Sequence, residues 1–308
     1  MDIAFFAAAL TAGSLLAVQA SANLQLTRAV GSPLGGSTVQ LSIAALLLVV
    51  LATATGSVGA IRHAAEVPVW QLLGGLASPL YITAGILLFP RLGALAAVGL
   101  FVTGQMFASL GLDVFGLLGV PQRSLNTGIA LGAVAVLAGI AVIIRGQSTQ
   151  PRPVRLGRRT GWVLLGIAAG AGLPVQGAVN ARLRDGIGEP LAVALVSFTV
   201  AALGIGLVLV LVLLSRSIPR PRLGPTAHMP WWGWLGAACA VAYVTAMFVL
   251  IPVIGAATTV ALTVAGQHVA SAVTDGRGLL RMPRRVLTPN RLGGVVLITA
   301  GSALIQLG

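Results

Sequence analysis

Long apolar stretches, separated by short polar ones, follow one another along the whole chain. Each stretch is continuous and close to the ~20 residues that a helix needs to cross a bilayer. Strands of a membrane barrel would be shorter and would alternate apolar and polar positions, so the pattern predicts helices. We expect ten spans: Ile3–Leu26, Ser37–Thr55, Trp70–Phe89, Leu92–Leu112, Asn126–Ile144, Trp162–Ala181, Pro190–Leu214, Trp231–Leu250, Ile254–Thr274 and Leu292–Leu307.

The longest connection, from Arg145 to Gly161, is rich in proline and arginine. Five predicted spans precede it and five follow it. We interpret it as a boundary between two units, residues 1–145 and 162–308, joined by a linker over residues 146–161.

The composition excludes several classes of protein. Only 8% of the residues are charged and 57% are hydrophobic, with a mean hydropathy of +0.98. Soluble domains carry about 25% charged residues, so a soluble enzyme, a disordered chain and a nucleic-acid-binding module are all excluded. The sequence predicts an all-α integral membrane protein whose first partner is the lipid bilayer.

The net charge of +13 comes from arginines that lie between the apolar stretches, without interleaved aromatic residues. Nucleic acid is therefore not an expected partner, and we interpret these residues as topology signals. We number each connection by the predicted span that precedes it. All but four of the 19 arginines then fall in the odd-numbered connections; the exceptions are Arg62, Arg123, Arg182 and Arg184. The positive-inside rule then places both termini outside the cytoplasm. Within the first unit the arginines divide evenly, so this orientation depends on the linker and the second unit.

The two units share a repeated series of polar and aromatic residues in the same order. The matched positions are Gln19/Gln176, Asn23/Asn180, Trp70/Trp232, Tyr81/Tyr243, Gln105/Gln267, Ser109/Ser271 and Asp113/Asp275. A unit of five spans is odd, so the second copy must enter the membrane from the opposite side. Two inverted repeats with a site near the midplane are the architecture of alternating-access carriers.

Two of these motifs also resemble a known family. The series Gln-x-x-x-Asn-x-x-Leu from Gln19 and the block from Gly104 to Gly119 resemble the YdcZ family of the drug/metabolite transporter superfamily. The resemblance covers most of the chain, once in each unit, as in a fused tandem version of a five-helix protein. It implies a bacterial inner-membrane carrier, an exporter. The second unit departs from the pattern, since Val253 replaces Arg91 and His268 replaces Met106, so the two units need not contribute equally.

Four carboxamides are candidate substrate-binding residues. Gln19 and Asn23 are four positions apart and share one helical face, as do Gln176 and Asn180. Amides within a bilayer need a partner or a polar cavity. Either these two pairs face each other across a substrate cavity, or they join helices through hydrogen bonds that average about 0.6 kcal/mol each.

Four further residues are candidates for the lining of the same cavity. Gln105 and Gln267 lie deep within predicted spans at matched positions. Tyr81 and Tyr243 are matched in the same way, and a buried phenol needs a hydrogen-bond partner. We therefore add all four to the substrate-binding candidates.

Proton coupling has three candidates: Asp113, Asp275 and His268. None of the six acidic residues falls in the middle of a span. The chain therefore lacks the central membrane glutamate on which the proton exchange of small multidrug pumps depends. The two aspartates lie at helix ends, where an ion pair or a loop cap is the alternative interpretation. His268 is the only histidine within a predicted span, and it can titrate near neutral pH or simply pack.

Other chemistry lacks the residues it needs. A Walker loop requires lysine, and the chain has none. One cysteine and three histidines are too few for an evident metal site or catalytic triad, so no cofactor, metal or enzymatic activity is expected. We predict a secondary transporter for a small polar metabolite or drug-like solute. The alternatives are a non-transporting membrane assembly protein and a membrane-embedded enzyme; monomer and homodimer both fit.

Overall fold

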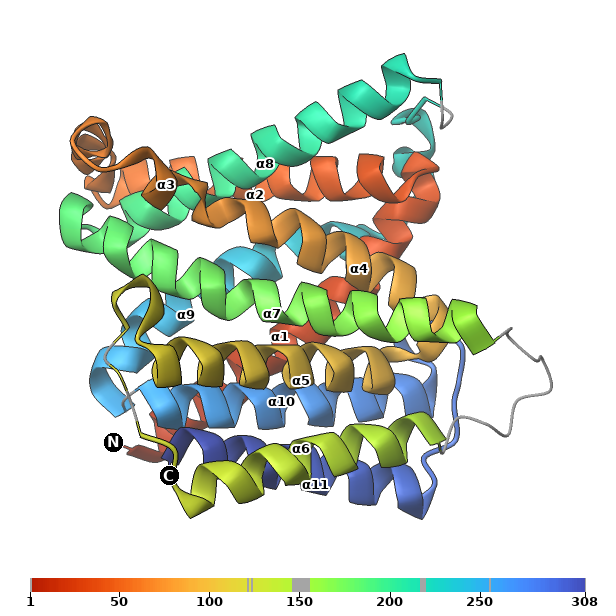
Figure 1. The fold of residues 1–308 in the computed structure, drawn as a ribbon. Coiled ribbons are helices and arrows are strands. Elements are labelled where there is room, and N and C mark those ends of the chain that lie inside the picture. Colours follow the sequence, from red (N-terminus) through yellow and green to blue (C-terminus); the bar gives the residue numbers. More distant parts are fainter. Residues whose placement is uncertain are drawn as a thin grey trace.

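The computed structural model describes residues 2–120, 122, 124–145, 156–216, 220–254 and 256–307. The regular structure in these residues is helical. The long helices lie side by side along one common direction, and the two chain ends emerge on the same side (Figure 1). The prediction of an all-helical chain is therefore confirmed for the described residues.

The first unit contains five long helical segments and several short turns. Its helices are α1 (Asp2–Val30), α2 (Pro33–Ala54), α3 (Val69–Leu72), α4 (Ala77–Leu92), α5 (Ala94–Phe115) and α6 (Thr127–Arg145), with 3-10 turns η1 (Ser57–Ala65), η2 (Leu73–Leu76) and η3 (Leu117–Gly119). The turn η1 lies in a stretch that we expected to be a simple connection.

The second unit repeats this order. Its helices are α7 (Leu156–Ile187), α8 (Pro190–Leu214), α9 (Leu235–Ile254), α10 (Ala256–Arg277) and α11 (Pro289–Leu307), with η4 (Gly224–His228), η5 (Trp231–Trp234) and η6 (Leu279–Arg281). Helix α7 begins at Leu156, so it takes up the second part of the expected linker 146–161. Residues 146–155 lie outside the described residues.

The span expected over Trp70–Phe89 is interrupted near its start. Helix α3 and turn η2 precede α4, and the change of helix type falls at Gly74 and Gly75. A Cβ atom on Gly75 would collide with the carbonyl oxygen of Ser197 in α8. Glycine at position 75 thus lets the backbones of η2 and α8 approach more closely than a side chain would allow.

Seven helical segments among the described residues are long and apolar enough to cross a membrane. They correspond to the first seven predicted spans. Helices α9, α10 and α11 are 20, 22 and 19 residues long and coincide with the last three. The structure thus supports a membrane protein, while the total of ten crossings stays a prediction.

The matched last helices of the two units, α6 and α11, pack against each other in an antiparallel pair. In the pair α6 and α11, a Cβ atom on Gly132 would lie 2.7 Å from the carbonyl oxygen of Gly301, and one on Gly139 would lie 2.7 Å from that of Gly294. The contacts follow opposite directions along the two helices. As a result, α6 and α11 end at opposite sides of the bundle (Figure 1).

The first helix of each unit packs mainly against the other unit. Helix α1 contacts α9 and α10, and α7 makes the matching contacts with α4 and α5. The closest points are also matched: a Cβ on Gly13 would collide with the backbone of Thr263, and one on Gly170 would collide with that of Phe101. The two units are therefore interlocked rather than laid side by side.

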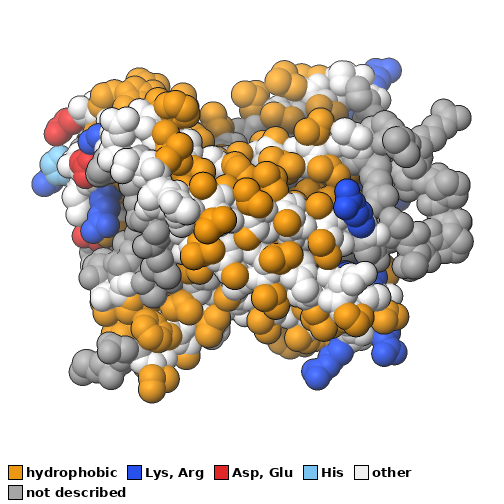
Figure 2. Space-filling view, turned by 60° about the horizontal axis from the view of Figure 1, so that its bottom comes forward, with side chains coloured by type: hydrophobic (Ala, Val, Ile, Leu, Met, Phe, Trp, Pro, Cys, Tyr) orange, Lys and Arg blue, Asp and Glu red, His pale blue; other side chains and the backbone are white. Residues whose placement is uncertain are grey.

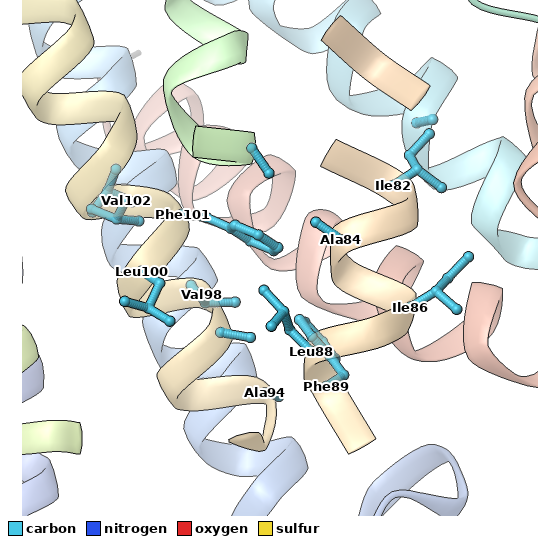
Figure 3. Packing of buried hydrophobic residues seen from close by; sticks show 14 of the residues in the cluster. Ile82, Ala84, Ile86, Leu88, Phe89, Ala94, Val98, Leu100, Phe101 and Val102 are labelled. Carbon is cyan, nitrogen blue, oxygen red and sulfur yellow. The ribbon is translucent and has the colours of Figure 1, made fainter. Parts of the chain in front are cut away.

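Apolar side chains fill the space within the bundle. Figure 3 shows Leu88 and Phe89 of α4 packed toward α5, with Phe101 of α5 reaching back toward Ala84. Among the seven segments long and apolar enough to cross a membrane, α5 is the most enclosed, since 72% of the residues in its most apolar 18-residue stretch are buried. Residues at its ends and on its faces are consequently well placed to join both units.

The outer surface carries an apolar belt. In α8, Leu203, Leu207 and Leu211 recur every four residues and are 68%, 61% and 56% exposed. Figure 2 shows hydrophobic side chains over the middle of one face, with charged side chains toward its two ends. Such a belt between charged rims matches the hydrocarbon layer of a bilayer and its two interfaces.

Candidate functional site

Two of the predicted carboxamides line a small cavity. Gln19 and Asn23 are one turn apart on α1 and only 5% and 1% exposed. The cavity measures about 10 Å³, roughly the space in which one water can be placed. It is lined by Leu16, Gln19, Ala20, Asn23, Tyr81, Ile82, Gly85 and Phe101.

A third carboxamide, Gln40 of α2, lies beside this pair. Gln40 is 1% exposed, and its Nε2 donates a long hydrogen bond of 3.4 Å to the carbonyl oxygen of Gly236 at the start of α9. Asn23 approaches the same glycine, since a Cβ there would collide with Asn23 Oδ1. The side-chain amides of Asn23 in α1 and Gln40 in α2 thus both lie next to Gly236.

The amide oxygens of these three residues lack a hydrogen-bond partner within the described part of the chain. They are Oε1 of Gln19, Oδ1 of Asn23 and Oε1 of Gln40. A buried polar atom without a partner costs about 1–3 kcal/mol. Protein interiors seldom keep such atoms without a reason, and functional sites are one such reason.

The second pair of carboxamides has different surroundings. Oε1 of Gln176 accepts a hydrogen bond of 2.9 Å from the hydroxyl of Ser78, and Nε2 of Gln176 donates one of 3.4 Å to Oγ of Ser197. Nδ2 of Asn180 also donates to Oγ of Ser197, at 3.1 Å. These bonds connect α7 with α4 and α8.

The two pairs do not share the cavity described above. Its lining includes Gln19 and Asn23 but neither Gln176 nor Asn180. Asn180 instead approaches Gly74 of η2, the position that matches Gly236. The cavity expected between both pairs is therefore not formed in this arrangement, because each pair contacts the start of a different helix in the opposite unit.

The matched tyrosines lie on matched helices. Tyr81 of α4 and Tyr243 of α9 are both half-buried. The ring of Tyr81 also packs against that of Phe101, with 4.7 Å between centroids and 45° between planes. Tyr81 belongs to the cavity wall, and Tyr243 lies outside it.

The remaining amide and histidine candidates lie outside the lining of this cavity. Gln267 and His268 of α10 are 3% and 0% exposed, while Gln105 of α5 is half-buried. The Nδ1 atom of His268 lies 2.9 Å from the carbonyl oxygen of Val264. Nε2 of His268, Oε1 of Gln267 and Nε2 of Gln105 lack a partner among the described residues.

Asp275 is fully buried near the end of α10. This end of α10 lies on the side of the bundle opposite the chain ends (Figure 1). Its carboxylate accepts hydrogen bonds from the backbone N–H groups of Ala94 and Leu95, at 2.8 and 3.2 Å. It also forms a 2.8 Å ion pair with Arg291, which is 3% exposed. One side chain thus caps α5 of the first unit and pairs with α11 of the second.

Arg285 closes the same cluster from the loop between α10 and α11. Its backbone N–H donates to the carbonyl oxygen of Asp275 at 2.7 Å, and its guanidinium donates to that of Arg91 at 3.2 Å. Burial lowers the pKa of Arg285 from its ordinary value, the Asp275 carboxylate raises it again, and the Arg291 charge lowers it further. The basic groups here are held by specific contacts.

Asp113 occupies the matched position at the end of α5 but is half-buried. The residue that matches Arg291 is Ile129, which carries no charge, so the surroundings of the two aspartates differ. Asp113 and Asp275 are consequently unequal candidates for coupling.

The sequence alone did not bring out three residues that complete these clusters. Gln40 was missed because its matched residue is Ser197, so no repeated amide marks the position. Ser78 and Ser197 were missed because single serines are common in membrane helices. A signal for Gln40 was available: it is an amide within an otherwise apolar stretch.

Comparison with protein families agrees with this architecture. One family model matches the chain twice, over residues 4–142 and 161–304, and its description is "Putative inner membrane exporter, YdcZ". The chain belongs to the YdcZ family. No individually curated protein matches the sequence. The two matched regions confirm the expected tandem arrangement and make this YdcZ-family chain an inner-membrane protein.

The described residues offer little to hold a metal. No group of three or more His, Cys, Asp or Glu side chains gathers among them in a way that could bind an ion. The polar groups that do gather are carboxamides, serines and a backbone carbonyl. Such uncharged groups can form hydrogen bonds with a polar solute.

Proposed function

We propose that the protein is a secondary transporter that moves a small polar solute across the bacterial inner membrane by alternating access. The observation that carries this proposal is the set of buried amide oxygens without partners beside a small cavity. Packing alone gives no reason to keep such groups in an apolar bundle, whereas a polar solute would pair with them. Membership of a family described as an exporter supports the same class.

We further propose that the chain crosses the membrane ten times as two inverted repeats. The matched helices α6 and α11 are antiparallel. The contacts of α1 with the second unit recur as contacts of α7 with the first. A pseudo-two-fold axis in the membrane plane accounts for both observations. The arginine distribution favours cytoplasmic odd-numbered connections with both termini outside.

The small volume of the cavity fits a state of such a carrier in which the site is too narrow to admit a solute. It holds about one water and is lined by only one of the two amide pairs. Alternating access requires that a site be closed for part of the cycle and open for the rest. Separation of α1 from α4 would widen the cavity at Gln19 and Asn23.

Matched alanines in two connections test the inverted repeats. Ala65 follows α2, Ala227 follows α8, and both are exposed. In a Cys239→Ser background, we expect Ala65→Cys to react with a membrane-impermeant maleimide in intact spheroplasts. Ala227→Cys should react only after permeabilisation, because the matched connections would lie on opposite sides. Reaction of both from the same side would contradict inversion.

Counterflow in proteoliposomes tests the transport function. With purified protein and a panel of small polar metabolites, we expect an internal pool of the right solute to drive uptake of the labelled solute. Protein-free liposomes give the background. Folded, correctly inserted protein without counterflow for any member of a broad panel would contradict the proposal.

The other two functions have less support. A membrane-embedded enzyme needs clustered acids or histidines, and the described residues hold no such group of three. A purely organising protein would not need unpartnered amides at a cavity. We therefore favour transport by a monomer, because both repeats are already fused in one chain.

A further inference from the structure

The two amide clusters occupy matched positions but are built differently. We name Gln19, Asn23 and Gln40 the first amide cluster, and Gln176, Asn180 and Ser197 the second amide cluster. Each residue of the first precedes its counterpart by the same 157 positions. The clusters are therefore copies of one ancestral arrangement, and differences between them can be compared residue by residue.

The second amide cluster is largely satisfied by its own neighbours. Gln176 bonds to Ser78 and Ser197, and Asn180 bonds to the same Ser197. Three hydrogen bonds thus join α7, α8 and α4. Only Oδ1 of Asn180 lacks a partner among the described atoms of this cluster.

The first amide cluster lacks these bonds because two residues have changed. Ala240 stands at the position that matches Ser78, so the hydroxyl that bonds to Gln176 has no counterpart for Gln19. Gln40 stands in place of Ser197 and turns its amide toward Gly236. Three buried amide oxygens remain without partners, and two of the three residues line the cavity.

The chemistry of the cluster selects what it can bind. The bond from Gln40 Nε2 to Gly236 fixes that amide, so its oxygen is an acceptor that needs a donor. No acidic residue lines the cavity, and a buried cation without a counter-charge is costly. A neutral N–H donor is therefore favoured over an ammonium group. The Tyr81 and Phe101 rings supply flat apolar walls beside it.

We propose that the first amide cluster alone is the ligand-binding half, that it accepts hydrogen bonds from the neutral NH₂ group of a primary amide, and that the second amide cluster serves to join helices. This inference rests on the proposed transport function and adds a substrate class to it. An amide NH₂ has two donors, which suits neighbouring carboxamide oxygens. Binding requires the cavity to widen, because a primary amide is larger than one water.

Acetamide is the probe, and N,N-dimethylacetamide, which has no N–H donor, is its matched control. Binding to the full-length protein in detergent is measured by saturation-transfer difference NMR on the methyl protons. We expect a signal for acetamide and a signal at least about fivefold weaker for the control, the change typical of losing one hydrogen bond. Equal signals, no acetamide signal with folded protein, or a stronger signal for methylammonium would each overturn the proposal.

The matched variants Gln19→Met and Gln176→Met test the asymmetry. We expect Gln19→Met to reduce the acetamide signal at least about fivefold with no fall in melting temperature, because no hydrogen bond is lost. Gln176→Met should keep the signal and lower the melting temperature, because bonds to Ser78 and Ser197 are lost. Equal losses of binding in both variants would overturn the asymmetry.

A second pair of matched positions, Gln40 and Ser197, tests whether the same difference appears in other variants. Gln40→Leu should weaken acetamide binding as Gln19→Met does, and Ser197→Ala should not. Counterflow that persists for some solute while these binding differences are absent would contradict this inference and leave the transport function intact. Absence of counterflow together with the expected binding pattern would contradict the transport function and leave the difference between the two clusters intact.

Discussion

Asp275→Asn is expected to lower the free energy of unfolding by about 3–5 kcal/mol, the usual cost of removing one partner from a buried ion pair. Arg291 is 3% exposed and would be left as a buried charge without its carboxylate. The change also weakens the cap on Ala94 and Leu95. Thermal and denaturant unfolding in detergent, followed by tryptophan fluorescence, measures the loss.

Asp113→Asn is the matched control. Asp113 is half-buried whereas Asp275 is fully buried, so water solvates the surroundings of Asp113 better and the effect should be smaller. The double variant Asp275→Asn, Arg291→Met should recover much of the stability, because it removes the stranded charge. Similar losses in the two aspartate variants, with no recovery in the double variant, would contradict the structural role of the pair.

Gly104→Ala is expected to destabilise the protein by about 1–3 kcal/mol, the usual cost of overpacking. The added methyl group would collide with the carbonyl oxygen of Ile167 and lie 2.9 Å from the backbone N of Ala171. Backbone atoms of α7 cannot rotate away as a side chain could. Helix propensity alone predicts the opposite sign, since alanine is favoured over glycine by about 1 kcal/mol.

Gly111→Ala on the same helix separates these two effects. No atom lies within 4 Å of a Cβ at Gly111, so helix propensity should act there without a clash. We expect this variant to be as stable as the parent or more so in thermal unfolding. If both alanine variants change stability in the same direction, the close contact between α5 and α7 is not the cause.

The positions of the helices followed from the sequence because a bilayer imposes a length and an apolar character on every crossing segment. The same constraint does not determine where a helix begins or ends outside the bilayer. Helix α7 therefore begins at Leu156, within a stretch whose prolines and arginines indicated a linker. The break before α4 was also missed, because the close contact of Gly75 with Ser197 on another helix cannot be read from local sequence.

The candidate site was only partly predictable. Helical spacing placed Gln19 and Asn23 on one face, and they do line a cavity. Spacing could not say which helix of the opposite unit each amide meets, and this decides that Gln176 bonds to Ser78 instead of facing Gln19. Nor could it show that Asp275 is fully buried, since Arg291 reaches it across a loop.

The interlocking of α1 with α9 and α10 has a consequence for how the protein is made. The ribosome releases α1 long before α9 and α10 exist, so its polar face must wait in the membrane or the translocon until synthesis is nearly complete. Long-range contacts of this kind slow folding, and partly assembled chains with exposed interfaces are vulnerable to misassembly. A chain cut at its midpoint would leave two fragments that each lack the natural neighbours of their first helix.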